Sequence, residues 1–199
     1  MFNEEITESE ASKYDKVWCH EEYAKYSPGE LYAKDAMERL YIPKKQLAYD
    51  FGTGSGKGAN VLLNAGFNSV VGFDYCESPS KWLADTNTGF MFIKEALHEM
   101  NSSYVVADFG LCADVMEHMP EQVIDDALRN MQCLSKTLYL GICTVGDVFG
   151  KAVGETLHLT VKPCEWWVER IGKVCGNATI IWRDDVSCGI VVNNSKFQE

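Results

Sequence analysis

Short apolar runs alternate with amphipathic segments along most of this chain, and this alternation constrains the fold more than any other feature. It is the pattern of parallel β-strands joined by crossover helices, which cover both faces of one sheet. The expected strands are residues 46–51, 69–73, 89–93, 106–113 and 137–143. The sequence therefore predicts an α/β fold with a mostly parallel sheet.

Helices and a final hairpin complete this pattern. Amphipathic helices are expected over residues 56–65 and 123–134, and another helix is expected to begin at Pro163. The last two apolar runs, residues 178–182 and 187–192, are so close in sequence that they are predicted to pair as an antiparallel hairpin. With this hairpin, the expected sheet has seven strands.

The N-terminal part of the chain carries helical signals before the first strand. Residues 1–9 are acidic and polar and are expected to fray. Over residues 9–26, aromatic side chains recur at helical spacing, which predicts a helix with an aromatic face. Residues 27–30, Ser-Pro-Gly-Glu, predict a capping box at the start of a second helix. Residues 1–44 are thus interpreted as a helical cap and residues 45–199 as the ligand-binding domain, within a single structural domain.

Charge and composition limit the partners of this chain. Twenty-nine acidic residues against 18 Lys plus Arg give a formal net charge of −11, which repels phosphate backbones and makes nucleic acid an unfavourable partner. No apolar run approaches the roughly 20 residues of a membrane span, so no membrane association is expected. The eight cysteines form no Cys-x-x-Cys pair and follow no signal peptide, so we expect reduced thiols in a cytoplasmic protein. The four histidines lack zinc-site spacing, and no metal site is predicted.

A glycine-rich turn, Asp-Phe-Gly-Thr-Gly-Ser-Gly at residues 50–56, joins the first predicted strand to the helix that follows it. Glycines let the backbone approach a ligand closely, and a helix N-terminus offers unpaired N–H donors. Asp74 closes the second predicted strand about 18 residues after Gly56, near the offset of roughly 20 at which a carboxylate binds ribose hydroxyls. The turn and Asp74 together predict a nucleoside site.

Three cofactors could use such a turn. A P-loop needs Lys followed by Ser or Thr, but Lys57 is followed by Gly58, which excludes ATP by that route. Residues 54–59 satisfy the dinucleotide pattern Gly-x-Gly-x-x-Ala, so NAD stays open. The carboxylate of Asp50 would repel a pyrophosphate and would attract the ammonium group of S-adenosyl-L-methionine, which favours the latter cofactor.

The turn and Asp74 closely resemble the first two signature motifs of the class I (Rossmann-like) S-adenosylmethionine-dependent methyltransferases. Residues 112–120, Cys-Ala-Asp-Val-Met-Glu-His-Met-Pro, resemble the Asp-Val-x-Glu-His-x-Pro segment of many small-molecule members. Residues 95–97, Glu-Ala-Leu, match the place where the family contacts adenine, with Glu where Asp is usual. The resemblance covers about residues 45–145. It implies a three-layer Rossmann-like methyltransferase fold, with a mostly parallel seven-stranded sheet and an antiparallel C-terminal hairpin.

The resemblance also implies a set of residues that contact the cofactor and its product, S-adenosyl-L-homocysteine. Asp50 and the turn backbone would hold the methionine moiety, Asp74 the ribose, and Cys112 the wall beside the sulfonium. The implied set is Asp50, Gly52, Thr53, Gly54, Gly56, Asp74, Tyr75, Glu95, Ala96, Leu97 and Cys112.

Methyl transfer needs an aligned acceptor and at most a modest base. His118, just beyond the fourth predicted strand, and His158, after the fifth, are the candidate bases, because a neutral imidazole accepts a proton near pH 7. His118 could instead orient its loop. Asp147 is a further candidate beside the acceptor. An N-terminal helix would close the site from water, and its candidate lid residues are Tyr14, Trp18 and Tyr26.

The acceptor itself is narrowed by what the chain lacks. The Asn/Asp-Pro-Pro-aromatic motif of DNA amino-methyltransferases is absent after the fourth predicted strand, and the net charge is strongly negative. A small molecule with an oxygen or nitrogen nucleophile is therefore the favoured acceptor. The alternatives are an NAD-dependent oxidoreductase and a relative that either is non-catalytic or cleaves S-adenosylmethionine.

Overall fold

The computed structural model describes residues 2–20, 23, 25, 27–76, 80–101 and 103–197, and its centre is a seven-stranded sheet with the order β3-β2-β1-β4-β5-β7-β6. The strands are β1 Leu47–Phe51, β2 Ser69–Asp74, β3 Phe90–Lys94, β4 Ala107–Ala113, β5 Ser135–Cys143, β6 Ala178–Arg183 and β7 Ser187–Asn193. Strands β1 to β5 pair in parallel, whereas β7 is antiparallel to both β5 and β6. The predicted mostly parallel sheet with an antiparallel C-terminal hairpin is confirmed.

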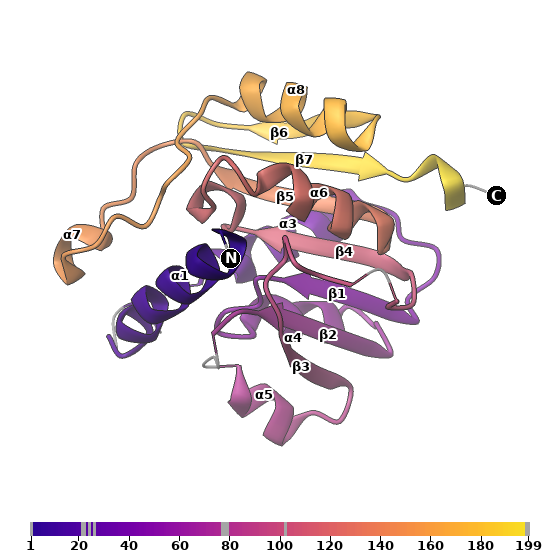
Figure 1. The fold of residues 1–199 in the computed structure, drawn as a ribbon. Helices are drawn as coiled ribbons and strands as arrows, with labels where there is room; N and C mark the ends of the chain where they lie inside the picture. The colour runs from indigo at the N-terminus through magenta and orange to yellow at the C-terminus, as the bar shows by residue number, and fades with distance from the viewer. Residues whose placement is uncertain are drawn as a thin grey trace.

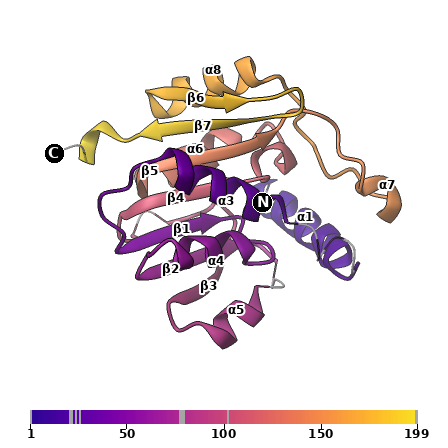
Figure 2. The ribbon, with the colours of Figure 1, turned by 180° about the vertical axis from the view of Figure 1, so that it is seen from behind.

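Helices cover both faces of this sheet and make three layers (Figures 1 and 2). The helical segments are α1 Phe2–Trp18, α3 Pro28–Arg39, α4 Lys57–Asn64, α5 Lys81–Thr86, η1 Met116–His118, α6 Ile124–Cys133, α7 Gly150–Val153, α8 Cys164–Cys175 and η2 Ser195–Phe197. Apolar residues of α6 and α8 form one core with the sheet, and those of α3 and α4 form another on the opposite face. Strand β4 lies at the centre and is buried along its whole length, which explains its nearly continuous apolar sequence.

The strand order separates this fold from the dinucleotide-binding fold, in which six parallel strands run 3-2-1-4-5-6. Here the antiparallel β7 lies between β5 and β6. This arrangement is the Rossmann-like methyltransferase fold. No helix within the described ranges is both long and apolar enough to cross a membrane.

Helix α1 corrects two expectations about the N-terminus. It begins at Phe2 rather than at Ser9, so the described part of residues 1–9 is helical and does not fray. An ion pair between Lys13 and Glu10 and the packing of Tyr14 and Val17 stabilise this helix, and sequence periodicity did not reveal these contacts. The helix ends at Trp18 rather than continuing to residue 26.

The capping box predicted at the start of α3 does not form. Ser27 is the N-cap residue, but its side chain makes no capping hydrogen bond; instead its hydroxyl accepts one from Ser55 Oγ at 3.2 Å. The carboxylate of Glu30 accepts from Lys34 Nζ at 2.6 Å. A tertiary partner for Ser27 and an i,i+4 partner for Glu30 thus replace the hydrogen bonds of the predicted capping box.

The predicted helical cap of residues 1–44 divides into two parts. Helix α3 packs on the sheet beside α4, with Tyr32, Ala33 and Ala36 in the core. Helix α1 instead lies beyond one end of the sheet, on the same side as α7 (Figure 1).

Candidate functional site

A cavity of about 920 Å³ lies where the parallel strands end. Segments that follow β1, β2, β3, β4 and β5 line it, and Tyr14 and Trp18 of α1 cover it. Ligands of open α/β sheets bind beyond the carboxyl ends of the strands, and this volume is near the upper end of known ligand pockets. The cavity therefore has room for a nucleoside cofactor together with a second small molecule.

The glycine-rich turn forms one wall of the cavity. Gly52, Gly54 and Gly56 have φ values of 75°, 46° and 75°, in the left-handed region that favours glycine. A Cβ atom at Gly52 would also overlap the side chain of Val115. The amides of Gly52 and Thr53 donate to Phe73 O at 2.8 and 2.9 Å, so the turn is fastened to β2. Gly56 is the N-cap of α4 and, unlike the other two glycines, does not line the cavity.

Asp50 lies beneath this turn and not at the cavity. Its carboxylate is 3% exposed and accepts from Thr53 Oγ1 at 2.8 Å, close to the start of α4. Burial raises the pKa of Asp50 to about 6. Asp50 is not among the residues that line the cavity: its carboxylate holds the turn from below, and its contact with the methionine moiety stays a prediction.

Asp74, by contrast, faces the cavity from the end of β2. Its two oxygens accept from Gly54 N and Cys76 N, each at 3.0 Å. Burial raises the pKa of Asp74, against the effect of these backbone donors. Because an ionised carboxylate has about four acceptor positions, Asp74 can still accept from two hydroxyls of a ligand. Tyr75 lies beside it and packs edge-on against Tyr14, with ring centroids 5.9 Å apart.

The segment after β3 places two of its three candidate residues at the cavity. Glu95 and Leu97 line it, whereas Ala96 is buried outside the lining, and its contact with the cofactor stays a prediction. Glu95 is fixed by Tyr104 Oη, which donates to Oε2 at 2.5 Å, and by the amide of Asn101, which donates to Oε1 at 3.1 Å.

Cys112 is likewise outside the cavity lining, and its contact with the cofactor stays a prediction. Its side chain is fully buried in the core on the α6 and α8 face, and the cavity wall at the end of β4 is formed by Ala113 and Asp114. Side chains alternate between the two faces of a strand, so a one-residue difference moves the contact from Cys112 to Ala113.

The two candidate bases meet in the cavity. His118 follows β4 in η1, His158 lies in the segment after α7, and their ring centroids are 4.6 Å apart. His118 Nδ1 lies within hydrogen-bonding distance of Tyr14 Oη and 3.1 Å from Leu157 O. His158 Nδ1 is 2.7 Å from Val145 O.

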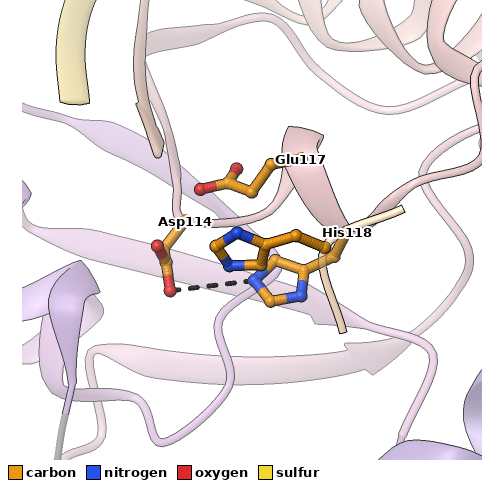
Figure 3. A group of neighbouring side chains, drawn as sticks. Asp114, Glu117 and His118 are labelled. Carbon is orange, nitrogen blue, oxygen red and sulfur yellow. Dashed lines mark ion pairs between the residues drawn. The ribbon is translucent and has the colours of Figure 1, made fainter. Parts of the chain in front are cut away.

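Two carboxylates join these histidines, and the sequence interpretation gave them no role. Asp114 Oδ2 lies 3.8 Å from His118 Nε2 (Figure 3). Burial raises the pKa of Asp114, but the hydrogen bond and charge of His118 outweigh this effect and lower it. Among the described residues other than glycine, Asp114 alone has a positive φ, 59°, a strained conformation of the kind that clusters at functional sites.

Glu117 is the second carboxylate, and it is fully buried. Its Oε1 accepts from Cys143 N at 2.6 Å, whereas its Oε2 has no hydrogen-bond partner in the part of the chain that the structure describes. Burial, followed by the charge of Asp114, raises the pKa of Glu117 well above its usual value. The spacing of Asp114, Glu117 and His118 at i, i+3 and i+4 was the available sequence signal, but His158 is joined to them only by the fold.

The lid candidates occupy different positions. Tyr14 reaches His118, and the Trp18 ring lies over the turn, 3.1 Å from where a Cβ atom of Gly54 would lie. Asp147 lines the cavity, but its carboxylate accepts hydrogen bonds from the amides of Phe149 and Gly150, at 2.7 and 2.9 Å. Tyr26 lies outside the described residues.

Comparison with solved structures supports the fold assignment. An O-methyltransferase family protein from Burkholderia thailandensis matches 90% of this chain with a TM-score of 0.66 and 13% identity, and this chain spans 62% of that one. A protein described as a methyltransferase, in complex with the Trm112 activator of Haloferax volcanii, matches 90% of this chain and 96% of its own, with a TM-score of 0.71 and 12% identity. Magnesium protoporphyrin IX methyltransferase from Synechocystis, with bound S-adenosylhomocysteine, matches 82% of this chain and 83% of its own (TM-score 0.60, 17% identity).

No protein-family model and no curated protein matches this chain by sequence. At these identities, the structural likeness establishes the fold.

Proposed function

We propose that this chain binds S-adenosyl-L-methionine and transfers its methyl group to a small-molecule acceptor, releasing S-adenosyl-L-homocysteine. The observation that carries the proposal is Asp74, a half-buried carboxylate at the end of β2 that faces the cavity beside the glycine-rich turn. Its place matches the position at which a carboxylate binds ribose hydroxyls in nucleoside sites. The similar Synechocystis enzyme, which has S-adenosylhomocysteine bound, supports the same cofactor.

The residues that would hold the cofactor follow from the cavity lining. Asp74 would accept from the ribose, the backbone of Gly52 to Gly54 would contact the methionine moiety, and Glu95 and Leu97 would border the adenine. The aromatic rings of Trp18 and Tyr75 would limit the access of water. The bound cofactor supplies an electrophilic methyl group: the acceptor–methyl bond forms as the carbon–sulfur bond breaks, and its electron pair stays on sulfur.

The hydrogen bonds of the turn argue against NAD. A pyrophosphate needs free backbone N–H groups at such a turn. Here the amides of Gly52 and Thr53 donate to Phe73 O, that of Gly54 to Asp74, and that of Gly56 to Thr53 O. Because the protein already uses these donors, a dinucleotide would have to displace internal bonds, whereas a ligand held by Asp74 would not.

His118 and His158 are the proposed groups for the acceptor's proton. Burial, followed by the neighbouring His118, lowers the pKa of His158, which favours its neutral, proton-accepting form near pH 7. Both imidazoles border the cavity beyond the turn, on the side where an acceptor would bind.

A thermal-shift titration with S-adenosylhomocysteine, S-adenosylmethionine and NADH tests the proposal. At a ligand concentration 100 times the Kd, binding adds about 2.7 kcal/mol of stability, which raises Tm by roughly 5 to 10 °C in a chain of this size. We expect this shift with the first two ligands and none with NADH. Asp74→Asn should remove most of it, and Asp85→Asn, at an exposed helical position, should not.

Absence of a shift at millimolar S-adenosylmethionine would contradict the proposal, and a shift with NADH alone would support an oxidoreductase. Mass spectrometry of the products then separates the remaining alternatives. S-adenosylhomocysteine formed only with an acceptor indicates transfer, other cofactor fragments indicate cleavage, and tight binding without product across an acceptor panel indicates a non-catalytic relative.

A further inference from the structure

Four side chains with metal-binding atoms converge at one point of the cavity. Asp114, Glu117 and His118 come from the segment after β4, and His158 comes from the segment after α7. One ligand atom from each lies within 4.8 Å of all the others. First-row metal ions take nitrogen and oxygen ligands at about 2.1 Å, so ligands on opposite sides of one ion are about 4.2 Å apart. The widest spacing, 4.8 Å, exceeds this by about 0.6 Å, so small side-chain movements would bring the four atoms around a single ion.

Both imidazoles are held in the orientation that a metal ligand needs. A backbone carbonyl only accepts, so the contact of His158 Nδ1 with Val145 O places a proton on that nitrogen, and the contact of His118 Nδ1 with Leu157 O favours the same tautomer. In the neutral form of His118, which makes no ion pair with Asp114, each Nε2 carries a lone pair for a metal ion. A hydrogen bond from the other ring nitrogen to a carbonyl is the usual support of a metal-bound histidine.

The two carboxylates lie at the same point as the imidazoles. Glu117 is fully buried with its Oε2 lacking a hydrogen-bond donor among the described residues, and Asp114 beside it is held in a strained backbone conformation. Buried charge of this kind is costly unless it is paired or coordinates a metal, and one dication would balance two carboxylates. Figure 3 shows Asp114 facing the His118 ring, with the Glu117 carboxylate beside them.

We propose that Asp114, Glu117, His118 and His158 bind one divalent first-row transition-metal ion of the Mn²⁺ to Zn²⁺ series. Two imidazole nitrogens and two carboxylate oxygens form a donor set that suits these ions, whereas Mg²⁺ and Ca²⁺ prefer oxygen ligands alone. Asp114, His118 and His158 line the cavity, so any further coordination position of the ion opens toward its interior.

The role of the ion in catalysis rests on the proposed function, but its binding does not. Any open coordination position lies at the acceptor side of the cavity, and a bound dication lowers the pKa of an oxygen that it contacts. This chemistry favours an acceptor that carries a hydroxyl group. With the ion bound, His118 and His158 are ligands and no longer bases.

Metal titrations of the full chain, first stripped with EDTA, test the site. The electron paramagnetic resonance signal of free Mn²⁺ should fall until one equivalent is bound, and calorimetry should give one Zn²⁺ per chain, bound more tightly than Mn²⁺, with Mg²⁺ weakest. Glu117→Gln and His158→Gln should each weaken Mn²⁺ binding roughly 10-fold or more. His20→Gln, at an exposed position outside the cavity, should leave it unchanged.

The inference fails if neither Mn²⁺ nor Zn²⁺ binds at one equivalent, or if Glu117→Gln and His158→Gln bind as the wild type does. Circular dichroism checks that the variants fold, and His158, which is only partly buried, offers the gentler substitution. Binding of S-adenosylhomocysteine to the EDTA-treated protein is measured in parallel. If this ligand binds but the metals do not, the inference alone fails; if the metals bind but the cofactor does not, the proposed function fails and the metal site stands.

Discussion

The two ends of the cavity are built in different ways. At the end formed by β1 and β2, backbone amides and Asp74 hold one another, and every polar group discussed there has a partner. At the end formed by β4 and β5, side chains distant in sequence bring two carboxylates and two imidazoles together, and Glu117 Oε2 lacks a donor among the described residues. At the first end, the polar groups already pair with one another around the space that a ligand would fill. At the second end, the two carboxylates would be balanced only by an added positive charge.

Removing metal ions should produce the largest difference in effect between the two ends of the cavity. EDTA treatment is expected to lower methyl transfer about 100-fold, because the acceptor side loses its ion, while the Kd for S-adenosylhomocysteine changes less than about twofold. Turnover by mass spectrometry and calorimetry on the same preparation measure the two quantities. Restoration of turnover by Mn²⁺ is the control, and full activity in EDTA would show that the two ends do not differ in this way.

Substitution within the turn should damage the first end through shape alone. Gly52→Ala adds a Cβ at a φ of 75° that overlaps Val115, so strain and overpacking together should cost roughly 3 to 4 kcal/mol in the free energy of unfolding. Gly154→Ala is the matched control, because its φ of 72° is similar but no atom lies within 4 Å of the added Cβ. Urea denaturation should therefore show a loss of only about 1 to 2 kcal/mol for the control. Equal losses in the two variants would mean that the contact with Val115 is unimportant.

The carboxylate beneath the turn should make stability depend on pH. Asp50 has a pKa raised to about 6 by burial, so the folded state retains its proton where the unfolded chain loses it. This contribution to the free energy of unfolding, up to about 3 kcal/mol, is fully present below about pH 4 and is lost as the pH rises to about 6. Asp50→Asn should reduce the difference between pH 4 and pH 7 in urea denaturation, and the contributions of Asp74 and Glu117, whose pKa values burial also raises, should remain. If the variant keeps the wild-type dependence of stability on pH, Asp50 is not the group that titrates.

The smallest effect is expected at Cys112, which the sequence suggested as a contact and which lies outside the cavity lining. Cys112→Ala should lower Tm slightly, because a buried side chain is shortened, but should change the Kd for S-adenosylhomocysteine less than about twofold. Calorimetry measures that Kd. A loss of affinity of 10-fold or more would indicate that Cys112 does form part of the cofactor site.

The first end of the cavity was largely predictable from the sequence. A strand, a glycine-rich turn, a helix and a second strand ending in Asp74 are contiguous, so their periodicity and spacing predict the geometry locally. The sequence did not show that Asp50 and Cys112 lie outside the cavity lining, because one residue decides between the two faces of a strand or turn. The predicted capping role of Ser27 was wrong because its hydroxyl instead accepts a hydrogen bond from Ser55, a residue distant in the sequence.

The second end could not be predicted in the same way. The sequence singled out His118 and His158 separately and predicted no metal site, because no local spacing relates them. Only the parallel pairing of β4 with β5 brings the segments that follow these strands to the same edge of the sheet, where the two rings lie 4.6 Å apart.

The sequence by itself determined the class of fold, the antiparallel hairpin at its end and the place of the glycine-rich turn, because these depend on patterns within short stretches of chain. The tertiary structure alone decided the order of the strands, which side chains face the cavity, and that two carboxylates and two histidines share one point. The physical reason is that burial and charge pairing are properties of the packed chain, in which residues far apart in sequence compete for the same space and the same partners.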